Sequence, residues 1–401
     1  MTNHTYDFDR VVNRCGTGDM KHECLQKFFG RSDLTPLWIA DMDFECIPEI
    51  AEAICRRMQH PVFGYQLAPD SYWQSIIGWL RHRHGVEVSR TELTFSPGVV
   101  KSLAAAVNYY TKVGDEIIIQ EPVYHPFRTV VEGALRKVSN NRLRLTPDGF
   151  EMDFEDLERR MAAGARLMLL CNPHNPVGIQ WSADTLCRVA RLAKKYGVTV
   201  ISDEIHGDLM LWGGKHLPFT ESCPEAAEVG VWLGAPSKTF NIPGFMSSWI
   251  VVRNPQLRDP FYAWLDSTEA NDPCFTATIA AEAAYTHGEP WLDQMLGYVE
   301  GNIEAVEQFF AKEMPQIKPV RPQASFLVWL DMRGLGLDHD ALVDGLVNHA
   351  RLALNDGTMF GDDACGFFRL NVAAPRSVIM NACRAIKDAF AGSSNGEEAP
   401  A

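Results

Sequence analysis

The sequence lacks the features that mark several large classes of protein. No uncharged apolar run in its 401 residues approaches the roughly 20 residues that a membrane-spanning helix requires. The N-terminus, MTNHTYDFDR, is polar and acidic where a signal peptide would be basic and then apolar. No run of Lys or Arg forms a basic stripe, and the formal net charge of -14 repels a phosphate backbone. These absences predict a cytoplasmic protein with neither a membrane nor a nucleic acid as its partner.

Metal and nucleotide motifs are also missing. The ten cysteines include no CxxC pair, and the nearest approach to a metal pair is His22 with Cys24. His82 and His84 lie two residues apart in a helical stretch, where such neighbours do not face each other. No P-loop occurs, and no GxGxxG opens a helix after a strand, which argues against nucleoside triphosphates and NAD. We therefore predict no metal site, and reduced, mostly buried thiols.

What the chain does contain is enough apolar sequence for a sizeable core, with 46% hydrophobic and 22% charged residues. From about residue 90 to 255, short apolar runs alternate with longer amphipathic ones, a pattern typical of βαβ units and a mainly parallel sheet. Helices are expected at 99–110, 153–163 and 182–196. The seven expected strands are 92–96, 116–120, 135–139, 166–171, 198–203, 229–233 and 247–252.

After residue 255 the pattern changes to one typical of a smaller α+β domain. Helices are expected at 275–287, 290–314, 338–350 and 376–390, with strands at 324–331 and 366–371. The prediction is an α/β protein with a large domain and a smaller α+β domain. Its expected divisions are an N-terminal segment (1–54) that joins the small domain, the large domain (55–285), the small C-terminal domain (286–390) and a disordered tail (391–401).

Candidate site residues follow the expected strands, because ligands of open α/β sheets bind at the carboxyl ends of the strands. Lys238 follows one strand on a segment of small residues, and a buried lysine there could form a Schiff base. Asp203 ends a very apolar strand, where its carboxylate needs a cationic partner such as a pyridinium nitrogen. Taken alone, Lys238 is more readily explained as a lysine of a surface loop, and Asp203 equally well as a helix N-cap or a structural hydrogen bond.

Four further features share this edge or a late strand. The turn Ser96 to Val100 follows a strand and opens a helix, so its backbone N–H groups could hold a phosphate. Asn175 lies in a Pro-bracketed turn as a possible donor, and Tyr124 could stack on a flat ring. Arg369 lies inside an apolar strand and is a candidate clamp for a carboxylate. A plain turn and core packing remain the ordinary alternatives for Asn175 and Tyr124.

The order of these features, with further motifs, resembles one enzyme family. The sequence is similar to the fold-type I, aspartate aminotransferase-like enzymes of class I/II, which use pyridoxal 5'-phosphate (PLP), and most closely to the cystathionine β-lyases of the MalY/PatB type. The resemblance covers nearly the whole chain. Its motifs are ADMDF (40–44), VFGY (62–65), CNPHNPVG (171–178), SDEIH (202–206), SKTFNIPG (237–244), GEPWL (288–292), GFFRLN (366–371) and PRS (375–377).

This resemblance implies a role for each residue around the ring of the cofactor. Lys238 would form the Schiff base with PLP and act in catalysis, and Asp203 would pair with the pyridine nitrogen. Asn175, aided by His206, would donate to the ring hydroxyl. Tyr124 would stack on the ring.

The resemblance also implies the residues that surround the ring. Arg369 would bind the α-carboxylate of an amino-acid substrate, with Ala40 beside it. Tyr65 would reach the phosphate bound by the neighbouring subunit and count among the catalytic residues, which implies a homodimer with shared sites. The phosphate would be held by Gly98, Val99, Val100 and Ser237.

Four positions depart from the pattern of the family. Val177 stands where NPTG has a Thr, and Ala235 stands where a phosphate-binding Ser is frequent. Asp356 precedes Gly357 where many members have Pro-Gly near the substrate pocket. Met246 replaces the phosphate-binding Arg of typical aspartate aminotransferases, as is compatible with the lyase subgroup.

The expected reaction is β-elimination of cystathionine or a related S-substituted cysteine, which gives a thiol (homocysteine from cystathionine), pyruvate and ammonia. Two alternatives stay open on the sequence alone. An aminotransferase would share the first steps of the reaction. A PLP-binding regulatory protein would keep the cofactor but act through a protein partner.

Overall fold

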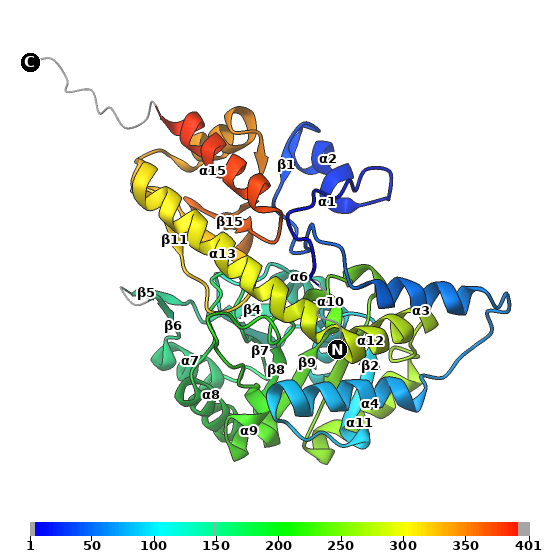
Figure 1. Ribbon diagram of the computed structural model, residues 1–401. Helices are drawn as coiled ribbons and strands as arrows, with labels where there is room; N and C mark the ends of the chain where they lie inside the picture. The colour runs from blue at the N-terminus through cyan, green and yellow to red at the C-terminus, as the bar shows by residue number, and fades with distance from the viewer. Residues whose placement is uncertain (1–4, 147–148, 392–401) are drawn as a thin grey trace, which may run out of the picture.

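A seven-stranded sheet forms the centre of the structure, a computed structural model that describes residues 5–146 and 149–391 (Figure 1). The strand order is β2-β10-β9-β8-β7-β3-β4, and β10 alone runs antiparallel to its neighbours. All seven strands predicted from the sequence are present. They are β2 (Leu93–Ser96), β3 (Glu116–Ile119), β4 (Lys137–Asn140), β7 (Leu167–Cys171), β8 (Thr199–Asp203), β9 (Gly230–Gly234) and β10 (Ser248–Val251).

Helices cover both faces of this sheet, which is why its central strands are apolar along their whole length. Alternate residues of β7 serve the two faces: Leu167 and Leu169 pack on one side, Met168 and Leu170 on the other. On the first side lie α5 (Val99–Tyr110), α6 (Pro126–Gly133) and α11 (Pro255–Ser267), and on the second α7 (Phe154–Ala162), α8 (Ala183–Tyr196) and α9 (Pro224–Val229).

The ends of α8 show how local sequence sets a helix boundary. The hydroxyl of Ser182 accepts a hydrogen bond from the N–H of Thr185 at 3.1 Å, which caps the first turn. Gly197 ends the helix in the left-handed conformation with φ of 67°, which costs a glycine little. The sequence predicted this helix to within one residue.

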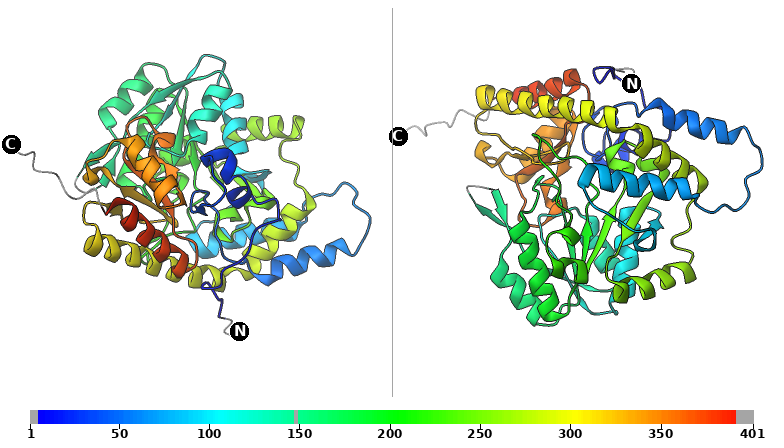
Figure 2. Two further views of the ribbon diagram at one scale, coloured as in Figure 1. Left: turned by 90° about the horizontal axis from the view of Figure 1, so that it is seen from above. Right: turned by 60° about the horizontal axis from the view of Figure 1, so that its bottom comes forward.

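A second, antiparallel sheet forms the smaller α+β part, in the order β11-β12-β15-β14. The long helix α13 (Glu289–Glu313) and the last helix, α15 (Arg376–Phe390), pack against each other beside it (Figure 2). The predicted helix 338–350 continues from α14 (His339–Asp344) into a π-helical turn, η6 (Gly345–His349). The strands are β11 (Lys318–Val320), β12 (Leu327–Asp331), β14 (Asn355–Asp356) and β15 (Phe367–Asn371).

The N-terminal segment lies beside this second sheet (Figure 1). Its short strand β1 (Thr35–Pro36) pairs in parallel with β13 (Leu352–Ala353), and two short helices, α1 (Met20–Glu23) and α2 (Leu25–Phe29), precede it. The predicted boundaries at 54/55 and 285/286 fall within α3 (Pro48–Met58) and α12 (Phe275–His287), and the domain division stays a prediction. Residues 392–401 of the predicted disordered tail lie outside the described residues.

An arm projects from the body where α3 is joined to α4 (Asp70–Trp79) (Figures 1 and 2). Both helices pack on α12, and α4 continues into a π-helical turn, η1 (Leu80–His84). Across residues 5–146 and 149–391, no helix has the length and apolarity needed to cross a bilayer.

Candidate active site

Lys238 lies on α10 (Pro236–Thr239), directly after β9. Its Nζ donates a hydrogen bond to the carbonyl oxygen of Ala40, which joins the N-terminal segment to the large sheet. Burial lowers the pKa of Lys238 to about 8, opposed by the carboxylates of Asp41 and Asp203. A substantial share of the amine is therefore neutral near pH 7 to 8, as a nucleophile or base requires.

Asp203 ends β8, the strand next to β9, so its side chain emerges at the same edge of the sheet as Lys238. It is 3% exposed, and its Oδ1 accepts a hydrogen bond from the N–H of Ile205 at 3.1 Å. Burial raises the pKa of Asp203 to about 7. A carboxylate in this state lacks a cation close enough to hold it ionised, although Lys238 contributes some attraction.

Arg369, on β15 of the smaller sheet, reaches across to the large sheet. Its Nη1 donates to Oδ1 of Asn175 at 3.0 Å, and its Nη2 donates to the carbonyl of Trp38 at 2.9 Å and to Oδ1 of Asn355 at 2.5 Å. These acceptors are all neutral, and the Nε has no partner. Burial lowers the pKa of Arg369 to about 10. An anionic partner would offset the cost of burying this charge.

Tyr124 and His206 complete the group around Asp203 and Lys238. The backbone N–H of Tyr124 donates to the carbonyl of Asn175 at 2.9 Å, and burial raises the pKa of its phenol. His206 is buried, its Nδ1 has no partner, and burial together with Lys238 and Arg369 lowers its pKa to about 3. The imidazole is therefore neutral, with one ring nitrogen free for a ligand.

The predicted phosphate turn lies at the carboxyl end of β2, on the same edge of the sheet. Gly98 adopts φ of 118°, a conformation that favours glycine, and its N–H donates to Oγ of Ser248 at 3.0 Å. No side chain caps α5, so the N–H groups of Val99 and Val100 remain without a side-chain acceptor. Ser237 is buried beside Lys238 on α10.

The structure thus brings together seven of the predicted residues through hydrogen bonds or mutual charge effects, and places the phosphate turn on the same edge. Tyr65 is separate from them: it lies on the projecting arm, and its relative exposure is 111%. The seven residues are Ala40, Tyr124, Asn175, Asp203, His206, Lys238 and Arg369.

Of the positions that depart from the family pattern, Met246 is the unusual one, with φ of 53° in the left-handed region that favours glycine. Val177 and Ala235 are buried, at 1% and 4% exposure. The carboxylate of Asp356 contacts His339 at 3.0 Å and accepts a hydrogen bond from the N–H of Thr358 at 2.8 Å. Both of its partners are therefore residues of the smaller part of the molecule. Met246 is half-exposed.

Two sets of residues around the site were not predicted. Asn355 faces Arg369 from the neighbouring strand, and Asn241 binds the backbone of Met42 and Phe44. The second set is the N-terminal ionic cluster, which consists of Arg14, Asp19, Lys21, Asp41 and Asp43. Its signal in the sequence is the pair of acids in ADMDF, which lie among apolar residues and so require cations.

The described part of the chain contains no group of three or more His, Cys, Asp or Glu side chains that could hold a metal ion. The ten cysteines form no disulfide, and only Cys171 and Cys383 are buried, so the prediction of mostly buried thiols is wrong. The groups that the site brings together are a lysine, a buried carboxylate, a neutral imidazole and a guanidinium.

Comparison with known proteins agrees with this arrangement. The family model described as "Aminotransferase class I and II" matches residues 32–386. Cystathionine beta-lyase PatB of Bacillus subtilis is 39% identical over 96% of this chain and all of its own length, and protein MalY of Escherichia coli is 33% identical over 95% of this chain and all of its own.

Among solved structures, cystalysin from Treponema denticola, which contains PLP, superposes with a TM-score of 0.92 at 31% identity, over 97% of this chain and 100% of its own. The resemblance predicted from the motifs is confirmed, as are the predicted architecture and sheet. With the family model matching most of its length, the chain belongs to the aminotransferase class I and II family.

Proposed function

We propose that this protein is a PLP-dependent carbon–sulfur lyase, which eliminates the sulfur substituent from Cβ of cystathionine or a related S-substituted cysteine. With water, cystathionine would yield homocysteine, pyruvate and ammonia. The observation that carries the proposal is a lysine beside a buried carboxylate at the carboxyl edge of the sheet. The names of relatives support the same class, since PatB is a cystathionine beta-lyase and cystalysin contains PLP.

The unsatisfied groups of the site fit PLP. The buried carboxylate of Asp203 accepts a hydrogen bond from a backbone N–H and has no close cation among the described residues. It is therefore available to pair with a pyridinium nitrogen. The free Nδ1 of His206 and the uncapped start of α5 offer a ring contact and a phosphate contact. When bound, PLP supplies a protonated conjugated ring that accepts the electron pair left at Cα.

Each side chain then has a task that follows from its surroundings. Lys238, with its pKa lowered to about 8 by burial, takes the proton from Cα as a neutral amine. Arg369 binds the α-carboxylate, because its protein acceptors are neutral and leave its positive charge uncompensated. Asn175 contacts Arg369 and lies beside Tyr124, so it links the substrate end of the site to the ring end.

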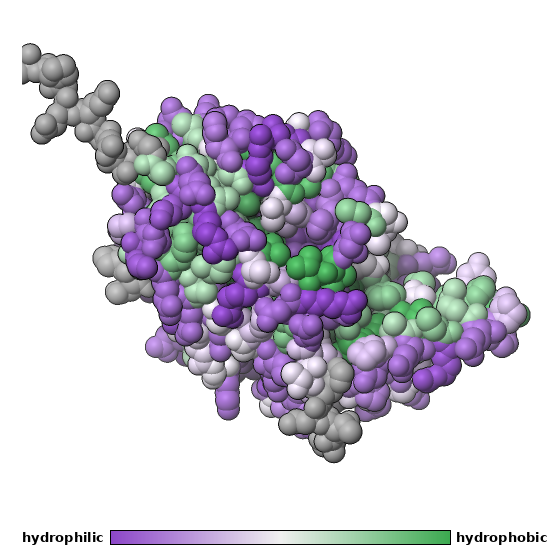
Figure 3. Space-filling view, turned by 45° about the horizontal axis from the view of Figure 1, so that its top comes forward, coloured by the Kyte–Doolittle hydropathy of each residue, from purple (hydrophilic) through white to green (hydrophobic). Residues whose placement is uncertain are grey.

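Tyr65 and the homodimer form part of the same proposal. The arm between α3 and α4 carries a strip of exposed hydrophobic residues (Figure 3), among them Val62 at 64%, Phe63 at 52% and Leu67 at 94% exposure. Apolar surface of this kind favours burial against another protein. We infer that a second copy covers it and that Tyr65 enters the partner's site.

We also propose a cytoplasmic location, supported by ten cysteines that form no disulfide. Cell fractionation with an antibody against the protein tests this.

The experiment that tests the activity supplies cystathionine or an S-alkyl cysteine to the purified protein without any keto acid. Pyruvate and free thiol should accumulate over many turnovers. Lys238→Ala should abolish both products, whereas Lys312→Ala, at an exposed lysine of α13, should not. An aminotransferase, the alternative that the family name favours, would stop after one turnover per site. That result would refute the lyase proposal.

A further inference from the structure

The backbone from Trp38 to Phe44 (the 38–44 segment) passes through the site and is held by hydrogen bonds to most of its carbonyl groups and to the N–H groups of Met42 and Asp43. Two of these carbonyls accept from functional side chains: that of Trp38 from Arg369 at 2.9 Å, and that of Ala40 from Lys238. The remaining side-chain donors lie on β15, on α1, in the chain just after α10 and in the chain before α1. Asn371 donates to residues 39 and 41, Asn241 to residues 42 and 44, Lys21 to residue 41 and Arg14 to residue 42.

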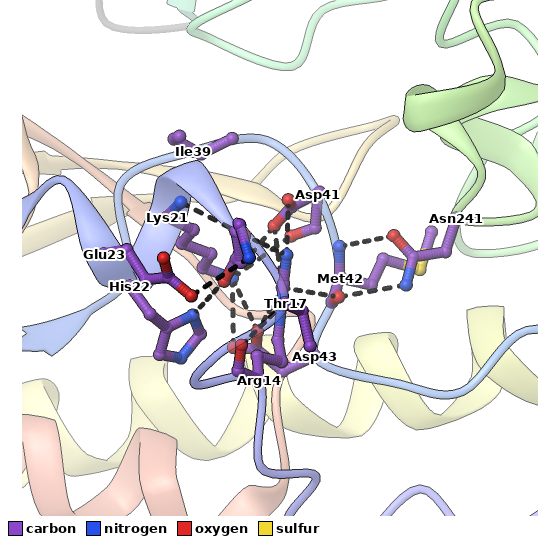
Figure 4. A network of polar contacts seen from close by, with 12 residues as sticks. Arg14, Thr17, Lys21, His22, Glu23, Ile39, Asp41, Met42, Asp43 and Asn241 are labelled. Atoms are coloured by element: carbon purple, nitrogen blue, oxygen red, sulfur yellow. Dashed lines mark hydrogen bonds and ion pairs between the residues drawn. The ribbon is translucent and has the colours of Figure 1, made fainter.

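The N-terminal ionic cluster grips the same segment through its acidic side chains (Figure 4). Arg14 binds Asp41 at 2.8 Å and Asp43 at 2.7 Å, and also reaches Asp19 at 2.8 Å. Lys21 contacts Asp43 at 3.0 Å and Asp41 at 3.3 Å. The segment is therefore fixed on one side by α1 and the turn before it, and on the other by Asn241, which follows α10.

Burial makes this cluster more than a surface ion pair. The side chain of Lys21 is 0% exposed, and those of Asp41 and Asp43 are 13% and 14% exposed. Asp19, Asp41 and Asp43 meet Arg14 and Lys21, and His22 also contacts Asp19 at 2.5 Å. Of these acids, Asp41 acts on Lys238, and a charge in a poorly solvated site acts strongly on a neighbouring amine.

We propose that the N-terminal ionic cluster is a positioning device for Lys238: it fixes the carbonyl of Ala40 and the carboxylate of Asp41 beside the free amine. The proposal rests on the proposed function and deepens it. Asp41, Arg14 and Lys21 are positioning residues, because they act on the reaction through Lys238 and the 38–44 segment. A free amine held at one acceptor stays in reach of the atoms between which it moves protons.

The charges around Lys238 allow the effect of the cluster to be measured. After burial, which lowers the pKa of Lys238, the next influence is Asp41, which raises it, while Lys21 lowers it. Removing Asp41's charge and removing Lys21's charge should thus move the pKa in opposite directions. The charged or titratable groups that face the amine from all sides are Asp41, Arg369, Asp203, Lys21 and His206.

The test compares three variants of the full-length protein after the cofactor has been removed. Trace acetylation with acetic anhydride across a pH series, with the peptide containing Lys238 quantified by mass spectrometry, gives the midpoint for the free amine. Asp41→Asn should lower this midpoint by about one pH unit, and Lys21→Gln should raise it by a smaller amount, because Lys21 has the weaker influence. The control Asp33→Asn removes an exposed carboxylate paired with Arg31 and should leave it unchanged.

A purely structural role for the cluster would not produce shifts of opposite sign. Midpoints for Asp41→Asn and Lys21→Gln that move together, or that match the control, would overturn the proposal. Each variant is melted to check its folding, and if Lys21→Gln does not fold, a midpoint of Asp41→Asn equal to that of Asp33→Asn overturns it alone.

Kinetics of the cofactor-loaded enzyme give a second reading. Asp41→Asn should lower kcat by about tenfold while KM changes by less than about threefold, since Arg369 keeps its own acceptors. A rise in KM without a fall in kcat would contradict a role through Lys238. If the wild-type protein forms no pyruvate, the lyase proposal fails, while the acetylation midpoints still decide the role of the cluster.

Discussion

The pKa values of Asp203, Lys238 and Arg369 are all shifted, and each shift favours the neutral form of the side chain. Burial is the first cause in each case. A fold that only needed stability would replace such groups, because buried charges without close partners are costly. Their convergence at one edge of the sheet is typical of a site that obtains its missing counter-charges from ligands. The predictions for single residues follow from these missing counter-charges.

Asp203→Asn should change how the stability of the cofactor-free protein depends on pH. Between about pH 4 and pH 7, Asp203 is protonated in the folded chain and ionised in the unfolded chain. The unfolded state then binds fewer protons, so the free energy of unfolding falls as pH rises, by at most about 1.4 kcal/mol per pH unit. Asp203→Asn should remove this slope, which thermal melts at pH 5, 6 and 7 would detect.

Asp340→Asn, on an exposed position of α14, is the matched control and should keep the wild-type slope. PLP should flatten the slope of the wild-type protein, because a ring cation would hold Asp203 ionised in the folded state. If Asp203→Asn and the wild type melt in parallel across this range, Asp203 is not the protonated group that its burial implies.

Arg369→Lys should weaken substrate binding more than it slows turnover. Lysine keeps the charge but loses the planar fork that binds a carboxylate through two N–H groups. KM for the amino acid should rise by about tenfold or more, with a smaller fall in kcat, as measured by steady-state pyruvate release. Arg333→Lys, at a partly exposed ion pair with Asp331, should alter neither constant. An unchanged KM would argue against Arg369 as the carboxylate site.

At the residue scale, the sequence predicted those side chains that immediately follow a strand. Lys238 and Asp203 could be found because the carboxyl ends of neighbouring parallel strands share an edge. Arg14 and Lys21 could not, because they act on residues more than 20 positions away and their own segment has little periodicity. Within residues 5–146 and 149–391, the hydrogen-bond acceptors of Arg369 are all neutral, so these residues do not supply the anionic partner that the sequence predicts for it.

At the scale of elements, one buried amide on α13 fixes the chain that follows β15. Asn302 donates from its Nδ2 to the carbonyls of Val372 and Ala374 at 2.8 and 2.9 Å, and its Oδ1 accepts from Arg376 at 2.6 Å. These carbonyls follow β15, the strand that carries Arg369. Asn302 therefore fixes the position of that strand's end against the helix.

Asn302→Ala should destabilise the protein by about 2–4 kcal/mol, because two buried carbonyl groups lose their donor. Urea denaturation followed by circular dichroism measures the loss. The same substitution at Asn348, an exposed residue that contacts Asp344, should cost less than about 0.5 kcal/mol. Equal losses of unfolding free energy at the two positions would show that burial of the Asn302 hydrogen bonds does not determine their contribution to stability.

The success of the sequence at this scale depended on burial. All residues of β7 and β9 are buried, and their apolar runs were predicted as strands. By contrast, α3 was not predicted, although Ile50, Ala53 and Ile54 recur at helical spacing on one face; only Ile50 is fully buried. The pair of β5 (Arg144–Thr146) and β6 (Gly149–Glu151) was also missed, and Phe150 is its one buried residue.

At the scale of the whole molecule, the site draws on segments far apart in the chain. Lys238 and Asp203 come from the large sheet, Arg369 from the small one, and Ala40 from the N-terminal segment beside it (Figure 1). No local sequence pattern specifies contacts between such distant segments, so the geometry of these contacts could not be predicted from the sequence. A single core that includes Phe44, Trp249 and Leu370 connects these parts.

Tyr65 extends this argument beyond one chain, because a fully exposed tyrosine can act only in a site supplied by another molecule. Tyr65→Ala and Lys238→Ala should each be inactive alone. Mixed, unfolded and refolded together, they should regain about a quarter of wild-type activity, since half of the dimers are hybrids and each hybrid has one site with both residues intact. Pyruvate release from the mixture measures this recovery, and a mixture as inactive as its parents would show that the sites are not shared.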